Sequence, residues 1–305
     1  MTEPADLLAQ LSNALVARTA LAADAVAAIR LAHGRHLTGT VWRSDLVVSS
    51  EQSLPRQDEF DVVTAGGAVV AAVLAGRDPS TNIAILRLAA PLAAPSLAAP
   101  SLAAAEPRAG ALVLAIGADG SGGASARSGL VNLAGPEWHS SRGGVIDRRI
   151  VLDISLGRRE EGGPVFDTAG GCLGMSTFGP RGQVLVIPVA TLERVVPLLL
   201  RDGRIARGWL GIGLQAVAVP DALREVAGQS SGLMVMSLVA DGPAAQAGLV
   251  AGDILLSIDG TSTHRARKIA GQFAADSIGR PTELRLIRGG QLIALQATIA
   301  ERPAG

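Results

Sequence analysis

The stretch that decides the fold is "GRREEGGPVFD", residues 157–167. Paired glycines followed by Pro-Val-Phe are typical of a tight turn that leads into a buried strand. A turn of this shape often presents a catalytic residue to a cleft. Two acidic residues, Glu160 and Glu161, stand just ahead of the glycines. The question is what an acidic pair does where a nucleophile could stand.

The composition is that of a globular protein with a large core. The chain has 305 residues, of which 48% are apolar, and this length suits two or three domains. The formal net charge is zero and aromatic residues make up only 2% of the chain. These values argue against a nucleic-acid-binding protein, which needs basic patches or stacking aromatics. The single cysteine, Cys172, excludes an intramolecular disulfide and a cysteine-based metal site.

The start of the chain, "MTEPADLLAQ", lacks the basic segment, apolar run and cleavage site of a signal peptide. The longest apolar segment, residues 88–105, is interrupted by prolines, which a membrane-spanning helix tolerates poorly. We therefore expect a cytoplasmic protein without a membrane span. If the start of the chain is misassigned, a periplasmic location is the alternative.

Hydrophobic patterns divide the chain into segments. Leucines at helical spacing predict an amphipathic N-terminal helix within residues 1–24 that packs on the rest of the protein. From residue 25, short β-rich runs separated by Gly, Asp and Pro predict a small antiparallel barrel or sandwich. A near-repeat of Leu-Ala-Ala-Pro-Ser then predicts a stiff, extended connector near residues 88–109. A second β-rich set follows this connector.

Two further patterns follow the second β-rich set. "TLERVVPLLLRDG" predicts a helix with Thr191 as its N-cap and Gly203 as its stop. Residues 208–303 predict a third unit with a strand entered through glycines, a strand that ends in an Asp-Gly turn, and a helix in "THRARKIAGQFAAD". A hairpin closed through Gly289 and Gly290 completes this unit.

Several motifs resemble those of the HtrA family, which joins a trypsin-like serine protease fold to a PDZ domain. "RDPSTNIAILRL" resembles the strand that carries the catalytic aspartate, and "EEGGPVFD" resembles the Gly-Asn-Ser-Gly-Gly-Pro nucleophile loop. "LVLAIG" is similar to the strand that opens the second barrel. The resemblance implies a mainly β fold: a short helix over residues 1–24, a trypsin-like double six-stranded β-barrel over 25–206, and an α+β PDZ domain over 207–305.

The positions of the family's catalytic residues do not match. Where the family has Thr-Asn-x-His-Val, this chain has "DLVVSSEQSL", and we place Glu51 at the histidine position. Asn82 stands at the aspartate position and Glu161 at the serine position, while Arg159 and Glu160 alter the oxyanion loop. Serine hydrolysis needs a nucleophile, a base and an orienter, and a carboxylate at Glu161 would repel the developing anion. We therefore expect no catalytic residues, and a pseudoprotease rather than an enzyme.

The acidic residues could instead gather to perform acid–base chemistry or to bind a divalent cation. We favour the simpler interpretation, in which their charges are solvated or paired with Arg158 and Arg159. His33 and His36 have a spacing that could suit a metal, but no third ligand is near them in the sequence. We expect no metal site and no cofactor.

The motif "WLGIG" is the most informative feature outside the catalytic positions. In a PDZ-like domain, such a loop turns its backbone N–H groups toward the terminal carboxylate of a peptide, which then pairs as an extra strand. The resemblance implies a peptide-binding groove formed by this loop, the edge strand after it and the following helix, with His264 at the rim. The residues expected in the groove are Leu210, Gly211, Ile212, Gly213, Leu214, His264, Ile269 and Phe273.

From these patterns we predict an adaptor, scaffold or regulator in protein quality control that binds protein C-termini or unfolded segments through its PDZ domain. One alternative is a serine endopeptidase or another hydrolase with a rearranged site. Another is a structural subunit that assembles with an active protease. The resemblance also implies a homo-oligomer, in particular a trimer.

Overall fold

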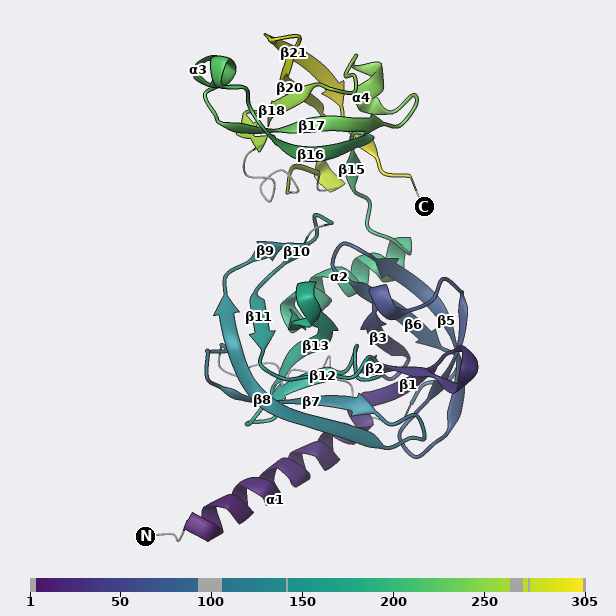
Figure 1. Cartoon of the computed structure of the whole chain (residues 1–305). Coiled ribbons are helices and arrows are strands. Elements are labelled where there is room, and N and C mark those ends of the chain that lie inside the picture. The colour runs from purple at the N-terminus through teal and green to yellow at the C-terminus, as the bar shows by residue number, and fades with distance from the viewer. Residues whose placement is uncertain (1–3, 93–105, 141, 264–270, 274, 304–305) are drawn as a thin grey trace. The chain divides into compact units, whose positions relative to one another are not determined.

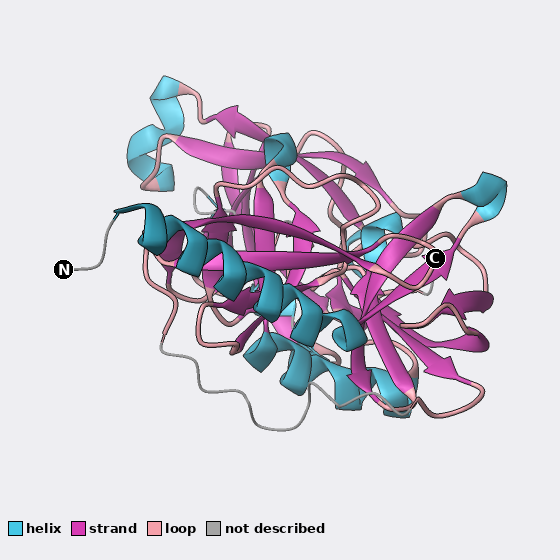
Figure 2. Cartoon of the chain, turned by 90° about the horizontal axis from the view of Figure 1, so that it is seen from below, coloured by secondary structure: helices cyan, strands magenta, loops and turns pink. Residues whose placement is uncertain are grey.

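The computed structural model describes residues 4–92, 106–140, 142–263, 271–273 and 275–303. Strands make up most of the secondary structure, with a small number of helices around them (Figure 2). The described chain forms two compact units. The first contains the described residues up to Trp138 and Val145–Arg204, and the second contains those of His139–Gly144 and those from Ile205 onward. The mainly β fold expected from the sequence is confirmed.

The first unit begins with a closed antiparallel barrel (Figure 1). Its core consists of apolar side chains that alternate along the strands, among them Ile29, Val41, Val47 and Leu86, all almost fully buried. The strand order is β1-β2-β3-β6-β5-β4, and the bounds are β1 Val26–Arg30, β2 His36–Arg43, β3 Leu46–Ser50, β4 Glu59–Val63, β5 Val69–Asp78 and β6 Ile83–Leu88.

A second closed barrel has the order β11-β14-β13-β12-β7-β8. Its turn at Gly162 has φ +92°, and the first three residues of the following strand, β12, are buried, which confirms the turn and strand predicted from residues 157–167. The bounds are β7 Leu112–Ala118, β8 Ala124–Gly135, β11 Arg149–Leu152, β12 Pro164–Asp167, β13 Cys172–Phe178 and β14 Val184–Pro188. A two-stranded sheet of β9 (Trp138–His139) and β10 (Val145–Ile146) lies outside this barrel.

The N-terminal helix α1, Pro4–Ala22, forms where the leucine spacing predicts it. Its packing differs from the prediction. The helix contacts β7 and β8, but Leu7, Leu8 and Leu21 remain largely exposed. The leucines therefore contribute little to the core of this unit.

Helix α2, Val189–Asp202, ends as predicted at Gly203, which has φ +71° and caps the helix in the left-handed conformation. The predicted N-cap is wrong. The helix begins before Thr191, and the Thr191 hydroxyl donates a hydrogen bond to Asp147 Oδ2 at 2.7 Å. That side chain therefore ties α2 to the loop before β11 instead of capping the helix.

The second unit is an α+β fold around one sheet with the order β16-β17-β18-β20-β21, so β16 is a sheet edge. The predicted hairpin through Gly289 and Gly290 is confirmed, because Arg288 pairs with Gln291. The bounds are β15 Gly208–Trp209, β16 Ile212–Ala218, β17 Ser231–Leu238, β18 Ile254–Ile258, β19 Thr261–Ser262, β20 Pro281–Arg288, β21 Gln291–Thr298, β22 Ala300–Glu301, α3 Arg224–Ala227 and α4 Pro243–Gln246.

Two sequence predictions lie outside the described residues. Most of the expected connector falls in residues 93–105, and half of the helix expected from "THRARKIAGQFAAD" falls in residues 264–270. Among the residues that the structure describes, no helix has the length and apolar character needed to cross a membrane.

Candidate functional site

The Glu161 side chain lies at the centre of a buried polar network between the two barrels. Only 1% of this residue is exposed. Its Oε1 atom accepts four hydrogen bonds and its Oε2 atom accepts one from Ser53 Oγ. The donors to Oε1 are Gln52 Nε2 at 2.6 Å, Ser50 Oγ at 2.7 Å, Thr177 Oγ1 at 2.9 Å and the Phe178 N–H at 3.2 Å. A buried carboxylate is tolerated when its lone pairs are satisfied in this way.

Asn82 belongs to the same network. Its Nδ2 atom donates to Ser50 Oγ at 2.9 Å and to Thr177 Oγ1 at 2.5 Å, while its Oδ1 atom accepts from the Gln52 N–H at 2.7 Å. Its backbone has φ +59°, a conformation that asparagine adopts more readily than most residues. The structure therefore brings together two of the three positions singled out from the sequence, Asn82 and Glu161.

Glu51, the third position, points elsewhere. Its carboxylate lies 3.6 Å from Arg77 Nη1, and the neighbouring Gln52 makes the contacts with both Asn82 and Glu161. Residues Glu51–Ser53 form a 3₁₀ turn, in which successive side chains point in very different directions. The structure therefore places Gln52, and not Glu51, in the network with Asn82 and Glu161. Thr-Asn-x-His-Val read from Ser49 also puts its histidine at residue 52.

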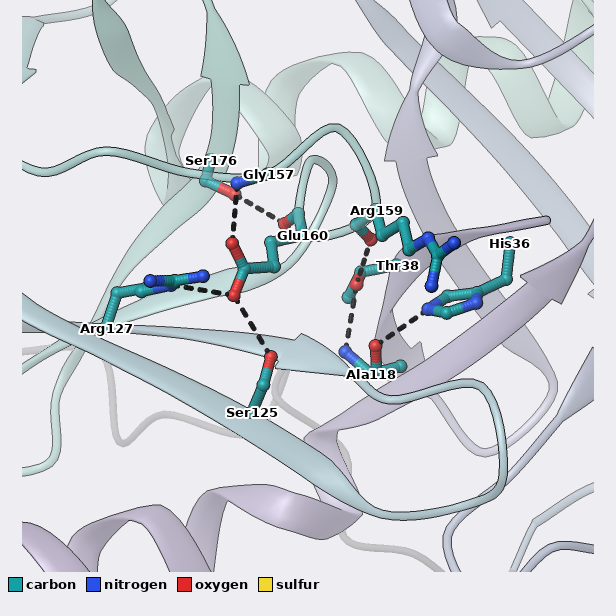
Figure 3. Close-up of polar contacts among 9 residues, drawn as sticks. All are labelled: His36, Thr38, Ala118, Ser125, Arg127, Gly157, Arg159, Glu160 and Ser176. Atoms are coloured by element: carbon teal, nitrogen blue, oxygen red, sulfur yellow. Dashed lines mark hydrogen bonds and ion pairs between the residues drawn. The ribbon is translucent and has the colours of Figure 1, made fainter.

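Glu160 is also buried, contrary to the expectation of a solvated charge or a pair with Arg158 or Arg159. Its Oε1 atom accepts from Arg127 Nε at 2.9 Å and from Ser125 Oγ at 3.3 Å, both on β8 (Figure 3). Its Oε2 atom accepts from the Gly157 N–H at 2.6 Å. The sequence analysis missed Arg127 because it lies on a strand that is distant in sequence from the loop.

The backbone of the oxyanion loop is held as well (Figure 3). Thr38 Oγ1 donates to the Arg159 carbonyl at 2.7 Å and accepts from the Ala118 N–H at 2.9 Å. The Glu160 N–H donates to the Gly157 carbonyl at 2.9 Å. Arg159 does not have a positive φ, so arginine in place of glycine causes no strain of that kind here.

The chemistry available in this network follows from its groups. In the described part of the chain, its hydrogen bonds join carboxylate, amide and hydroxyl groups, and none of them involves a histidine. The half-buried Ser53 hydroxyl donates directly to a carboxylate. Burial raises the pKa of the Cys172 thiol to about 12, which leaves it unreactive at neutral pH. The described residues contain no group of three His, Cys, Asp or Glu side chains that could hold a metal ion.

The second unit contains a groove at its β16 edge. Gly211 has φ +77°, and a side chain there would come within 3.1 Å of the Trp209 ring. The loop Leu210–Ile212 leads directly into β16, whose outer edge has no neighbouring strand among the described residues. The pocket beside it is lined by Arg142, Gly143, Arg207, Gly208, Trp209, Leu210, Gly211, Ile212, Leu214, Leu233, Ile258, Phe273 and Arg302.

These positions agree in part with the sequence analysis. Leu210, Gly211, Ile212, Leu214 and Phe273 line the pocket as expected, and Gly213 lies on β16 between two of them. His264 and Ile269 lie outside the described residues.

An ion pair fixes one end of β20 in the same unit. Asp253 is 1% exposed and accepts from Arg288 Nε at 2.8 Å and Nη2 at 2.7 Å. Burial alone would raise the pKa of Asp253, but the hydrogen bonds from Arg288 and from the Val250 N–H outweigh it and hold the pKa below its usual value.

Comparison with known proteins identifies both units. A trypsin-like peptidase domain matches residues 37–175 and a PDZ domain matches residues 208–299. A probable periplasmic serine endoprotease, DegP-like, of Brucella suis biovar 1 (strain 1330) is 30% identical over 263 residues, which are 84% of this chain and 50% of the relative. The serine endoprotease DegS of Escherichia coli (strain K12) is 28% identical over 267 residues, or 85% of this chain and 74% of the relative.

A solved structure, the HtrA-type protease AlgW with tripeptide, has a TM-score of 0.70 and 25% identity, and the match covers 95% of this chain and 98% of that one. The chain spans about half the length of the DegP-like relatives.

These comparisons correct two expectations. We expected a protein that is not an enzyme, but the relatives are named serine endoproteases and the solved structures are named HtrA-type proteases, so that expectation is overturned. We also expected a cytoplasmic location, but the DegP-like relatives are named periplasmic. The architecture, the two domain matches and these relatives together show that the chain belongs to the HtrA-like family.

Proposed function

We propose that this protein binds the free C-termini of proteins or of unfolded segments through the groove between the Leu210–Ile212 loop and Phe273. The observation that carries the proposal is an apolar pocket directly beside a sheet edge. An extended peptide can pair with such an edge through its backbone, while the pocket receives its last side chain.

The loop that precedes β16 supports the choice of a C-terminus over an internal segment. Successive backbone N–H groups around a glycine with positive φ form a concave site that favours an anion. The name of AlgW records a tripeptide with that relative. By this analogy the ligand enters with its carboxylate at Gly211 and its chain along β16.

Fluorescence polarisation tests this proposal on the full chain. The probes are fluorescein-labelled decapeptides that differ only in a C-terminal Val, Leu, Ile or Phe, each prepared with a free and an amidated C-terminus. We expect at least one free peptide to bind in the micromolar range, about −8 kcal/mol, and its amide to bind about 10-fold more weakly. Equal binding of free and amidated forms, or no binding, would reject the proposal.

We propose peptide-bond hydrolysis by a rearranged site as a second candidate function. The observation that favours it is the contact between Ser53 Oγ and Glu161 Oε2. Ser53 is half-buried on the 3₁₀ turn that follows β3, and Oε2 accepts its hydrogen bond while Oε1 accepts the other four. In this candidate, Ser53 is the nucleophile and Glu161 takes its proton, because a carboxylate can act as the general base for a hydroxyl.

A fluorophosphonate probe and unfolded casein separate this candidate from a protein that only binds. The candidate requires labelling and casein cleavage that both disappear in Ser53→Ala and persist in Ser155→Ala, since Ser155 is an exposed serine outside the network. An unlabelled protein that leaves casein intact would reject hydrolysis, and labelling that survives Ser53→Ala would reject the assignment to Ser53.

We further propose a periplasmic location, by analogy with the names of the DegP-like relatives. Fractionation of the native cells, with detection by antibody, tests this location.

We also propose self-association or assembly with an active protease, because α1 exposes Leu7, Leu8 and Leu11. Light scattering on the purified chain and on a variant with these leucines changed to Ser tests self-association, and co-purification from native cells tests the other partner.

A further inference from the structure

The C-terminal end of the described chain returns to the peptide-binding loop. Strand β22 pairs with β15, with Gly208 opposite Glu301 and Trp209 opposite Ala300. The Arg302 N–H then donates to the Arg207 carbonyl at 2.8 Å. These contacts place the Arg302 backbone beside the segment that leads into the Leu210–Ile212 loop.

The pocket at this loop has two chemically different kinds of lining side chain. It is lined by apolar side chains from the sheet and from Phe273 and by three arginines, of which Arg207 and Arg302 flank the β15–β22 pair and Arg142 precedes β10. None of the described lining residues is acidic. Arg302 is exposed, so its guanidinium can reorient toward a ligand at little desolvation cost. The pocket is therefore complementary to a ligand with an apolar side chain and one negative group next to it.

A C-terminal residue has this chemistry, because its carboxylate lies two bonds from the side chain. The backbone N–H groups of the loop can bind one oxygen of such a carboxylate. A guanidinium binds carboxylates with two parallel, charge-assisted hydrogen bonds, which are stronger than bonds between neutral groups. The loop and the arginine could therefore act on the same ligand group from two sides.

We infer that Arg302 is a second recognition element for the ligand's terminal carboxylate, and that it acts together with the Leu210–Ile212 loop. This inference rests on the proposed function. It assigns the selectivity for a free C-terminus in part to a side chain from the strand that ends the unit. The sequence pattern of a carboxylate-binding loop does not reveal this residue.

A binding cycle on the full chain tests the inference. Free and amidated forms of the decapeptide with C-terminal Leu are titrated against the unmodified protein, Arg302→Ala, Arg302→Lys and Arg285→Ala. Arg285 is the matched control, since it is an exposed arginine of the same unit that does not line the pocket. We expect Arg302→Ala to weaken the free peptide 5- to 20-fold and to leave the amide unchanged, with Arg302→Lys in between and Arg285→Ala without effect.

The outcomes distinguish a failure of the role assigned to Arg302 from a failure of the proposed peptide binding. If the free peptide binds better than the amide but Arg302→Ala weakens both equally or neither, the inference is overturned while the proposed function stands. If no peptide of the set binds to the unmodified protein, the proposed function fails and the role of Arg302 fails with it. Melting temperatures of the four proteins, which should agree within about 2 °C because both arginines are exposed, identify any variant that is merely unfolded.

Discussion

Two regions of the molecule each lie next to a glycine with positive φ, and the glycine has a different role in each. One is the β16 groove. The other is the Glu161 network, which consists of Glu161 and the side chains hydrogen-bonded around it: Ser50, Gln52, Ser53, Asn82 and Thr177. At Gly162, a Cβ atom would lie 2.2 Å from the Thr38 carbonyl oxygen, so glycine allows close packing between the barrels. At Gly211, the backbone turns beside an open pocket. Gly162 therefore permits a close contact between the barrels, whereas Gly211 forms part of the lining of a pocket.

The polar groups of the two regions also differ, in their burial and in their hydrogen bonds. The carboxylates of Glu160 and Glu161 are buried and hydrogen-bonded by neighbouring side chains and N–H groups. A ligand that engaged them would first have to break bonds that already exist. The groove offers apolar surface and arginine side chains at a sheet edge. On the proposed function the groove receives a peptide, while the hydrogen bonds of the network join the two barrels.

The largest effect is expected from removing the carboxylate of Glu161. Glu161→Ala leaves the buried hydroxyls of Ser50 and Thr177 and the Gln52 amide without this acceptor, and we expect the free energy of unfolding of the barrel unit to fall by about 3 kcal/mol. Urea denaturation followed by circular dichroism measures this change. Glu161→Gln, which keeps one oxygen acceptor, is the control and should lose about half as much. A loss below about 0.5 kcal/mol in the alanine variant would show that the network does not hold the barrels together.

A pH-dependent effect is expected in the PDZ unit, where an ion pair rather than a network stabilises the fold. The pKa of Asp253 is lower in the folded than in the unfolded protein, where it is about 4. Its contribution is therefore complete above pH 4 and is lost as the pH falls through the folded pKa. Arg288→Gln should remove about 2 kcal/mol at pH 7 and should make the unfolding free energy of this unit less dependent on pH below about 4. An unchanged pH profile in this variant would contradict the assignment.

A smaller effect is expected from Arg127, because this side chain is half-exposed and its ion pair with Glu160 is partly screened by water. Arg127→Ala should cost about 1 kcal/mol and should speed hydrogen exchange at the Gly157 N–H, which bonds the same carboxylate. Arg127→Lys should restore most of the protection if charge is the important property. Equal exchange in all three proteins would show that the oxyanion loop is held without this pair.

The architecture could be predicted well from the sequence, because the patterns that indicate it lie within short stretches of the chain. Turn glycines, alternating apolar residues and the order of the motifs identified two barrels and a PDZ unit, and Gly203 and Gly289–Gly290 mark a helix end and a hairpin where the structure has them. The packing of α1 was not predictable in the same way. Leucine spacing reports a helix, but it does not report whether another element covers that helix.

The site was predicted less completely because its contacts join distant strands. Glu161 and Asn82 were found from motifs, but Gln52 was missed by one residue in a 3₁₀ turn, where such an error changes the direction of the side chain. Arg127 and Arg302 were missed because only the barrel closure and the β15–β22 pairing bring them to their partners. The residues at the catalytic positions also led us to expect that the protein is not an enzyme, and the family relationship overturns that expectation.

If the proposed function is right, the groove and not the Glu161 network holds the C-terminal end of the peptide. The most direct test measures the affinity of the full chain for the free Leu-ended decapeptide in two variants, Gly211→Val and Glu161→Gln, with melting curves to confirm that both are folded. We expect Gly211→Val to weaken binding at least 10-fold, because a side chain there crowds Trp209 and disturbs the loop, and we expect Glu161→Gln to bind like the unmodified protein. Loss of binding in Glu161→Gln together with full binding in folded Gly211→Val would contradict this proposal.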